Sequence, residues 1–357
     1  MPPHHPVPIR TEEIPMRVSK VAVAVLALAG LTAGTASADG TGSLRLSEAT
    51  TVGIHNTYDT AAYQYLAQSL DAGANLIELD AWFNIFTHKW NVSHSNPIGS
   101  DNNCVQAKSP TANLYSGTRN QNLNDCLDDI NVWLGNHPTA GPLTVKIELK
   151  AGFDGNIGMG PASLDSYVHN SLGSRVFRPV DLLGSYPTLD DAAKANNWPT
   201  RSALAGRVLV EIIPGTVEEQ NPTDHLWTDV EYAQYLKGLA AAGNLSQAQI
   251  FPAVHNAAAG DPRTRYADAT LRPWFVVFDG DASGYIDGGI DTSFYVNNHY
   301  FLIMTDAENV KPAIDDVNPT VQQAQDRVAL VASKGASVVG TDWRQLTTVL
   351  PEVLPRG

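Results

Sequence analysis

The sequence predicts an α/β fold, a single TIM-like (β/α)8 barrel. Short apolar runs that suit β-strands alternate with helical stretches, and turns rich in Gly, Pro and Asn separate them. This alternation is typical of parallel βαβ units. About eight such repeats in roughly 300 residues favour a closed barrel over an open sheet. The chain shows no internal repeat and no low-complexity linker, so we expect one domain over residues 39–357.

The expected strands lie at short apolar runs spread along the whole domain. They cover residues 51–56, 76–82, 143–150, 208–213, 274–278, 300–304 and 337–340, and a shorter run at 249–254 is a candidate for the eighth. Helical patterns cover residues 61–72, 126–136, 228–242 and 320–334. A Gly-rich loop at 152–161 follows the third strand, on the side of a barrel where active sites form.

Residues 1–38 are expected to lie outside the barrel. A basic stretch at 16–20 precedes an almost wholly apolar run at 21–31, and small residues lead up to Ala38. This pattern is typical of a secretory signal peptide, here from Met16 to Ala38, with residues 1–15 as an upstream extension. The apolar run is shorter than the roughly 20 residues that a membrane span needs. We expect a secreted, extracellular protein; the alternative is an ordinary N-terminal helix.

The composition indicates a well-buried core and an acidic surface. Hydrophobic residues make up 43% of the chain and charged residues 17%, which excludes a disordered protein. The formal net charge is −14. Such a surface does not gather on nucleic acid or on anionic lipid by simple attraction. We therefore expect no nucleic-acid partner, and a cation must mediate any contact with an anionic substrate. We expect the protein to be a monomer.

Two cysteines, Cys104 and Cys126, follow the export signal. A single pair in an exported protein indicates one disulfide bond. The bond would close a short loop and contribute about 3 kcal/mol to stability on the chain-entropy model. The alternative is two free, buried thiols.

Charged residues alternate with aliphatic ones in two of the expected strands. Glu78 and Asp80 alternate with Ile77 and Leu79 in the strand at 76–82. The strand at 143–150 places Lys146, Glu148 and Lys150 on one face in the same way. In a barrel the apolar face meets the helices, so these charged side chains are expected to point inward.

Inward charges are costly unless they are paired or bind a metal ion. Three carboxylates at one barrel mouth would repel each other by several kcal/mol per pair at an effective dielectric near 20. A divalent cation removes this repulsion, and all-oxygen ligands favour Ca²⁺ or Mg²⁺ over zinc. No Cys/His cluster with zinc spacing is present. The alternative is a buried layer of ion pairs without a metal ion.

Two histidines lie at the ends of strand-like runs. His55 ends the first expected strand, and His94 ends a short run that begins at Trp90. Beside an acidic, metal-type cluster, the two side chains suit acid–base work or charge stabilisation near pH 7.

The order of these residues resembles the catalytic domain of calcium-dependent phosphatidylinositol-specific phospholipases C, and most of all the secreted actinobacterial members. The matching motifs are His55-Asn56, Glu78-x-Asp80, His94 and Glu148-x-Lys150. The specific part of the resemblance runs from Leu46 to Lys150, and a looser part continues to Trp343. It also extends to glycerophosphodiester phosphodiesterases and sphingomyelinase D enzymes. The first of these typically carry Arg after the first His, where this chain has Asn56.

The resemblance implies a mechanism as well as a fold. The implied calcium ligands are Asn56, Glu78, Asp80 and Glu148. Because consecutive strand residues face opposite ways, His55 and Asn56 can both reach the site only if the chain turns there.

The implied substrate is phosphatidylinositol, or a related phosphodiester lipid, at a membrane surface. The inositol 2-hydroxyl would attack phosphorus, giving diacylglycerol and (cyclic) inositol phosphate. His55 would stabilise the transition state, and His94 would protonate the leaving oxygen. Lys150 would contact the phosphate, or else merely pair with Glu148. The competing hypotheses are a glycerophosphodiesterase or sphingomyelinase D-like enzyme, and an inactive barrel that binds phosphoinositide or sugar.

Overall fold

The computed structural model describes residues 38–215, 218 and 226–357. The expected extension and signal segment lie outside the described residues except for Ala38, with which the compact unit 38–357 begins. None of the helices in the described part is long and apolar enough to cross a membrane.

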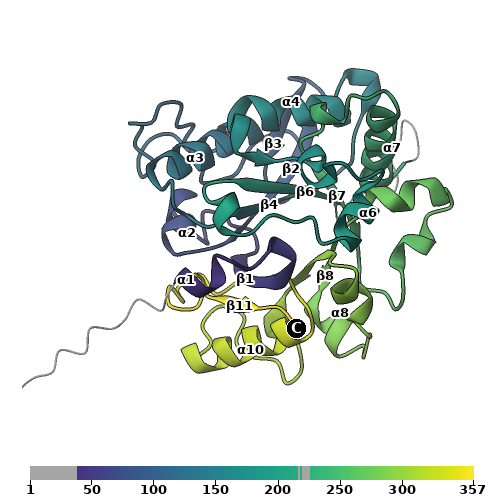
Figure 1. Ribbon diagram of the computed structural model, residues 1–357. Coiled ribbons are helices and arrows are strands. Elements are labelled where there is room, and N and C mark those ends of the chain that lie inside the picture. The colour runs from purple at the N-terminus through teal and green to yellow at the C-terminus, as the bar shows by residue number, and fades with distance from the viewer. Residues whose placement is uncertain (1–37, 216–217, 219–225) are drawn as a thin grey trace, which may run out of the picture. The chain divides into compact units, whose positions relative to one another are not determined.

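A closed parallel β-barrel forms the centre of this unit (Figure 1). Within the described residues its eight strands are β1 (Ala49–Ile54), β2 (Leu76–Asn84), β4 (Leu143–Leu149), β6 (Val208–Pro214), β7 (Phe251–His255), β8 (Val277–Asp281), β9 (Phe301–Thr305) and β10 (Val338–Thr341). Each strand pairs in parallel with the next, and β1 closes the ring by pairing with both β10 and β2. The TIM-like barrel that the sequence predicts is therefore confirmed.

Three further strands in the described part of the chain lie outside the ring. They are β3 (Lys89–Val92), antiparallel to β2, β5 (Val176–Phe177), parallel to β6, and β11 (Val353–Pro355), antiparallel to β1. The β2–β3 pair is a hairpin that extends β2 beyond the mouth of the barrel.

The helices are irregular in length. The α-helices are α1 (Ala38–Thr41), α2 (Ala67–Asp71), α3 (Leu123–Asn136), α4 (Pro161–Leu172), α5 (Pro179–Leu183), α6 (Leu189–Lys194), α7 (Thr228–Ala241), α8 (Ala282–Ile286), α9 (Ser293–Asn297) and α10 (Val321–Ser333). Short 3₁₀ helices cover Leu46–Glu48, Gly155–Ile157, Gly173–Arg175, Ser202–Leu204, Leu245–Gln247, Pro262–Arg265, Ala269–Trp274 and Ala307–Asn309.

Some expected elements differ from the observed ones. The helix expected at 61–72 forms only as α2, because the Asp59 and Gln68 side chains accept hydrogen bonds from the backbone N–H groups of Ala61 and Tyr65 and hold the chain in turns. The strand expected at 274–278 begins only at Val277, since a 3₁₀ helix precedes it. Helices α4 to α6 were not among the expected elements, whereas β3 corresponds to the strand-like run that begins at Trp90.

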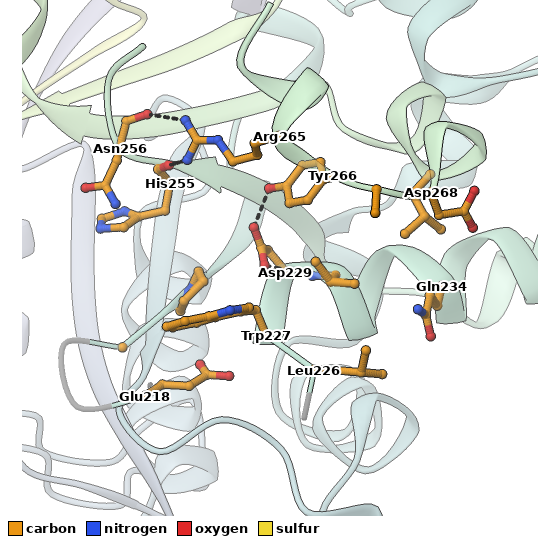
Figure 2. Close-up of a pocket in the computed structure, with 15 residues that line it drawn as sticks. Glu218, Leu226, Trp227, Asp229, Gln234, His255, Asn256, Arg265, Tyr266 and Asp268 are labelled. Carbon is orange, nitrogen blue, oxygen red and sulfur yellow. Dashed lines mark hydrogen bonds between the residues drawn. The ribbon is translucent and has the colours of Figure 1, made fainter. Parts of the chain in front are cut away.

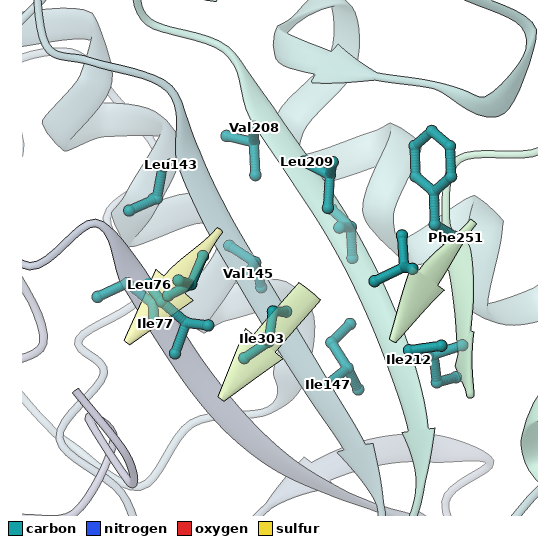
Figure 3. Close-up of a cluster of buried hydrophobic side chains, with 14 of the residues drawn as sticks. Leu76, Ile77, Leu143, Val145, Ile147, Val208, Leu209, Ile212, Phe251 and Ile303 are labelled. Carbon is teal, nitrogen blue, oxygen red and sulfur yellow. The ribbon is translucent and has the colours of Figure 1, made fainter. Parts of the chain in front are cut away.

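The aliphatic positions of the barrel strands form the core around the sheet (Figure 3). Ile77 on β2, Val145 and Ile147 on β4, and Ile212 on β6 are fully buried. They alternate with the charged side chains of the same strands, as period-2 strand geometry requires. The charged side chains therefore point into the barrel.

A charged network fills part of the barrel interior. The Nζ of Lys146 lies 3.3 Å from Oε1 of Glu78 and 3.1 Å from Oδ2 of Asp279 on β8. Glu211 on β6 is fully buried beside them, and burial together with the charge of Asp279 raises its pKa well above the ordinary value. Lys146 supplies the buried cation that allows Glu78 and Asp279 to stay ionised.

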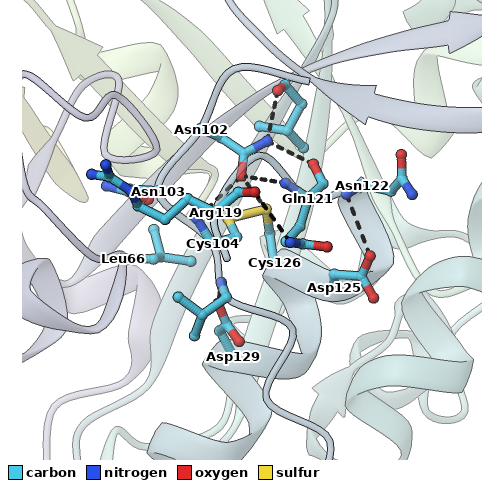
Figure 4. Close-up of a disulfide and its surroundings, with 12 residues drawn as sticks. Leu66, Asn102, Asn103, Cys104, Arg119, Gln121, Asn122, Asp125, Cys126 and Asp129 are labelled. Atoms are coloured by element: carbon cyan, nitrogen blue, oxygen red, sulfur yellow. Dashed lines mark hydrogen bonds between the residues drawn. A yellow bond between two sulfur atoms is a disulfide. The ribbon is translucent and has the colours of Figure 1, made fainter. Parts of the chain in front are cut away.

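The disulfide bond expected from the sequence is present between Cys104 and Cys126, with Cα atoms 5.0 Å apart (Figure 4). It joins the loop after β3 to the first turn of α3. The buried side chain of Asn102 supports the same junction, since its amide donates to the carbonyls of Val92 (2.8 Å) and Gln121 (2.6 Å). This junction fixes the segment that leads away from the β2–β3 hairpin.

We predict that replacing both cysteines by serine lowers the free energy of unfolding by about 3 kcal/mol. Without the disulfide bond the unfolded chain gains the conformational entropy that the closed loop had removed. Urea unfolding of the double variant and of the wild type measures this loss. Mass spectrometry of the unreduced protein should show one crosslinked peptide pair. Quantitative alkylation of both thiols without a reductant would contradict the assignment.

We predict that Lys146→Met destabilises the fold by about 3–5 kcal/mol, because it leaves Glu78 and Asp279 buried without their cation. The matched control is Lys194→Met. This lysine pairs with Asp190 but is 47% exposed, so its loss should cost less than about 1 kcal/mol. Urea unfolding compares the two variants, and equal losses would show that the interior pair has no special role.

Candidate active site

Three buried carboxylates meet on the neighbouring strands β2 and β4, close to where the pairing of these two strands ends at Ala81 and Leu149. Glu78, Asp80 and Glu148 each offer an oxygen within 4.8 Å of the others, and their exposed fractions are 2%, 1% and 6%. The strand register sets this arrangement, because Asp80 lies directly opposite Glu148 on the neighbouring strand. The sequence prediction that these acids converge inside one barrel mouth is therefore confirmed by their positions.

Asn56 reaches the same cluster because the chain turns immediately after β1. Its φ of 51° lies in the left-handed region, which Asn tolerates better than most residues. Its backbone N–H donates to Oε2 of Glu78 at 3.0 Å, and its side-chain Oδ1 accepts from the Tyr58 hydroxyl at 3.0 Å. The turn that His55 and Asn56 both require is thus present.

Tyr58 is a part of the cluster that sequence reasoning missed. Its hydroxyl lies 2.8 Å from Oδ2 of Asp80 and 3.0 Å from Oδ1 of Asn56. Burial and the negative charge of Asp80 raise the pKa of Tyr58, so the hydroxyl stays protonated. Its single O–H donates a hydrogen bond to one or the other of these two oxygens. Its place two residues after Asn56, at the end of the first strand, was the signal available in the sequence.

His55 lies against the Glu78 side of the cluster. Its Nε2 is 3.4 Å from Oε2 of Glu78, and its Nδ1 is 3.8 Å from Asp342 and 4.0 Å from Asp306. The charge of Glu78 raises the pKa of His55 to about 10, against the opposing effect of burial. Asp306 and Asp342, which directly follow β9 and β10, were not among the expected site residues. Carboxylates thus surround this imidazole on several sides.

His94 lies on the Asp80 side and is far more open to solvent. Its Nδ1 is 3.1 Å from Oδ2 of Asp80, while 66% of its side chain is exposed. It comes just after β3, so the β2–β3 hairpin brings it back over the strand that carries Asp80. The two histidines therefore contact different carboxylates of the cluster, His55 contacting Glu78 and His94 contacting Asp80. Only His94 presents its ring broadly to solvent.

Lys150 is buried among the same carboxylates. Its Nζ lies 3.1 Å from Oδ2 of Asp80 and 2.9 Å from Oε1 of Glu148, with 2% of the residue exposed. Burial lowers the pKa of Lys150, but the charges of Asp80 and Glu148 outweigh it and raise the pKa overall. In this structure the lysine pairs with both acids, which is the alternative role considered from its sequence. An ammonium has three N–H donors, so one remains for another acceptor.

The cluster suits a hard divalent cation. Burial and the charges of Glu78 and Glu148 raise the pKa of Asp80 to about 6. Oδ1 of Asp80 is buried and has no hydrogen-bond partner among the described residues. Three carboxylates and the amide oxygen of Asn56 form an all-oxygen donor set of the kind that Ca²⁺ or Mg²⁺ prefers. The residues present therefore fit a calcium ion.

A pocket of about 760 Å³ opens at the same end of the barrel, beyond β6 and β7 (Figure 2). Trp227 and Asp229 from the start of α7 line it, together with His255 and the Arg265–Tyr266 pair. Arg265 donates to the backbone carbonyls of His255 and Asn256, and the Tyr266 hydroxyl donates to Asp229.

The pocket is linked to the carboxylates through the barrel interior. Nδ1 of His255 lies 3.5 Å from Oδ1 of Asp279, which in turn pairs with Lys146 and so with Glu78. None of the pocket residues was expected as a site residue from the sequence, since their convergence depends on loops that follow different strands.

Comparison with solved structures shows the family of the chain. A Ca²⁺-dependent phosphatidylinositol-specific phospholipase C from Streptomyces antibioticus is 51% identical, with a TM-score of 0.85, and the match covers 88% of this chain and 99% of that one. The calcium-dependent phosphoinositol-specific phospholipase C of a Gram-negative Pseudomonas sp. is 18% identical over 88% of this chain and 96% of that one, with a TM-score of 0.63, which shows the shared fold.

Two other comparisons found nothing. No family model matches the sequence, and no curated protein matches it significantly. The identity to the Streptomyces enzyme, over nearly the whole of that protein, is nevertheless decisive. The chain belongs to the family of calcium-dependent phosphatidylinositol-specific phospholipases C.

Proposed function

We propose that this protein is a secreted, calcium-dependent phospholipase C that cleaves phosphatidylinositol. The observation that carries the proposal is the convergence of three carboxylates, one amide oxygen and two histidines at one barrel mouth. The 51% identical Streptomyces enzyme supports the same activity. Secretion rests on the signal-peptide pattern of the N-terminal residues, and we propose that the enzyme acts as a monomer at a lipid surface.

Asn56, Glu78, Asp80 and Glu148 would hold the calcium ion. Bound calcium would lower the pKa of the inositol 2-hydroxyl and neutralise charge that grows on the phosphoryl oxygens. The surrounding side chains keep this donor set in place: Lys146 pairs with Glu78, Lys150 bridges Asp80 and Glu148, and the Tyr58 hydroxyl donates to the cluster.

The reaction would be an internal displacement at phosphorus. The oxygen of the inositol 2-hydroxyl attacks phosphorus and gives its proton to a carboxylate of the site, for which Glu148 is the candidate. The bond from phosphorus to the glycerol oxygen breaks, and the products are diacylglycerol and a cyclic inositol phosphate. Holding the hydroxyl in line with phosphorus supplies much of the rate advantage.

Each cationic or titratable side chain has a distinct role in this scheme. His94, which is open to solvent, gives its proton to the departing glycerol oxygen. His55, held among carboxylates, donates a hydrogen bond to the phosphoryl oxygen where charge develops. The remaining N–H of Lys150 contacts the phosphate.

The other hypotheses are less well supported. A glycerophosphodiesterase of this superfamily typically has Arg after the first histidine, whereas this chain has Asn56, and Asn56 lies in the acidic cluster. An inactive barrel would have no reason to keep both histidines within reach of Glu78 and Asp80. A phosphorus NMR assay of the water-soluble product from phosphatidylinositol tests the activity directly, and a cyclic inositol phosphate is expected.

We predict that exhaustive chelation of divalent ions abolishes this activity and that added Ca²⁺ restores it. Glu78→Gln should weaken calcium binding at least tenfold, because the variant removes a charged ligand from the site. Calcium titration calorimetry measures the affinity, and a melting curve separates this loss from a loss of folding. The control is Asp326→Asn, which changes the net charge by the same amount but on the exposed face of α10. Full activity after chelation would refute the metal assignment.

We predict that the two histidine variants respond differently to the leaving group. His94→Ala should lose roughly 10²–10⁴-fold on phosphatidylinositol, because a glycerol alkoxide needs a proton as it departs. It should lose much less on a nitrophenyl inositol phosphate, whose leaving group hardly needs one. His55→Ala should damage both substrates about equally. Steady-state kinetics on the two substrates make the comparison, and the same pattern in both variants would overturn the roles.

A further inference from the structure

A buried carboxyl group lies between two helices on the outside of the barrel sheet. Asp165 on α4 is only 4% exposed. Helix α4 packs against α7, and α7 packs against strands β6 and β7 of the barrel (Figure 1). The reaction proposed above makes no use of this acid.

Asp165 connects three parts of the chain through one of its oxygens. Its Oδ1 accepts hydrogen bonds from the Tyr232 hydroxyl on α7 and from the backbone N–H of Gln249 (3.0 Å), just before β7. The Tyr232 oxygen in turn accepts from the backbone N–H of Ile250 at 3.1 Å. We call these four residues the Asp165 junction. It ties α4 and α7 to the start of β7 at one buried point.

The second oxygen of Asp165 is buried and has no hydrogen-bond partner among the described residues. The same is true of Oε1 of Gln249, the residue whose backbone N–H already binds Asp165. A proton on Oδ2 turns that oxygen from an acceptor into a donor. Because a buried polar group without a partner costs free energy, the neutral acid suits this junction better than the carboxylate does.

No cation balances a charge on Asp165. The groups that act on it are the hydroxyls of Tyr232 and Tyr235 on α7 and the N–H of Gln249. The other charged or titratable groups on α4 and on the elements packed against it are Tyr167 and His169 on α4, Asp125, Asp128 and Asp129 on α3, Arg175 after α4, and Asp229, Glu231 and Lys237 on α7. Burial outweighs the hydrogen bonds and raises the pKa of Asp165 to about 7.

We propose that the Asp165 junction is a pH-sensitive switch that holds α7 in place while Asp165 is neutral and loosens it when Asp165 ionises. The first turns of α7 form one wall of the pocket, through Asp229, Val230 and Gln234. The folded chain binds the proton of Asp165 more tightly than the unfolded chain, in which the pKa is near its ordinary value of 3.8. The stability from this proton is fully present below that value and is lost as the pH rises through about 7. The pocket wall is therefore firmest in mildly acidic surroundings.

Asp165→Asn tests the switch, because asparagine keeps the shape of the neutral acid and can donate a hydrogen bond but cannot ionise. Urea unfolding at pH 5 and at pH 9, with saturating calcium, measures the equilibrium constant of unfolding. Between these pH values we expect the constant to rise at least tenfold more in the wild type than in the variant. The control is Asp326→Asn on the exposed face of α10, which should follow the wild type.

Hydrogen exchange of the wild type locates the effect. After correction for the intrinsic exchange rate, the amides of α7 and of residues 249–251 should exchange at least tenfold faster at pH 8 than at pH 5, whereas those of α10 should not. Asp165→Asn should remove this difference. Glu218, which accepts hydrogen bonds from Thr228 at the start of α7, is the same in both proteins, so the comparison isolates Asp165. Equal protection of α7 at the two pH values, or the same pH dependence in the wild type and in Asp165→Asn, would overturn the proposal.

Discussion

Keeping several carboxylates ionised inside a closed barrel is the constraint on which the rest of this structure depends. Two unit charges 4 Å apart interact by about 4 kcal/mol at an effective dielectric of 20, so the acids at this mouth cannot stay charged without nearby cations. Lys146 balances the negative charge of Glu78 inside the barrel, and Lys150 bridges Asp80 and Glu148. Oδ1 of Asp80 is buried and has no hydrogen-bond partner among the described residues, so these lysines leave one oxygen of the cluster unsatisfied. A calcium ion at the mouth would use such an oxygen as a ligand.

The same constraint explains how the site can work on a phosphodiester. A cation held by oxygen ligands is the means by which an acidic protein can bind an anionic substrate. Around this centre the chain places His55 in a ring of carboxylates and His94 in the open. The two environments differ in exposure and in local charge, which suits two different tasks in one displacement. The β2–β3 hairpin joins these features, because β2 carries Glu78 and Asp80 and His94 follows β3.

The features of the structure that follow from strand periodicity could be predicted from the sequence. Alternation of Glu78 with Ile77 placed the acids inside, and the barrel and the disulfide bond were also expected. Tyr58 was missed although it lies two residues after Asn56. The aspartates beside His55 could not be predicted, because they meet it only after β1 pairs with β10 and the chain turns at Asn56. Local hydrogen bonds shortened one expected helix, and helices α4 to α6 have weak sequence patterns between two strong strands. The features that could not be predicted depend on the closure of the barrel by strands far apart in the sequence and on local turns. The alternation of charged and aliphatic residues along a strand does not encode them.

A crystal structure with calcium, using anomalous scattering, tests the central claim most directly. We predict one strong peak at the mouth, about 2.3–2.6 Å from oxygens of Asn56, Glu78, Asp80 and Glu148. A calcium ion bound elsewhere, or a mouth with no peak and with Lys150 still bridging Asp80 and Glu148 at saturating calcium, would contradict it.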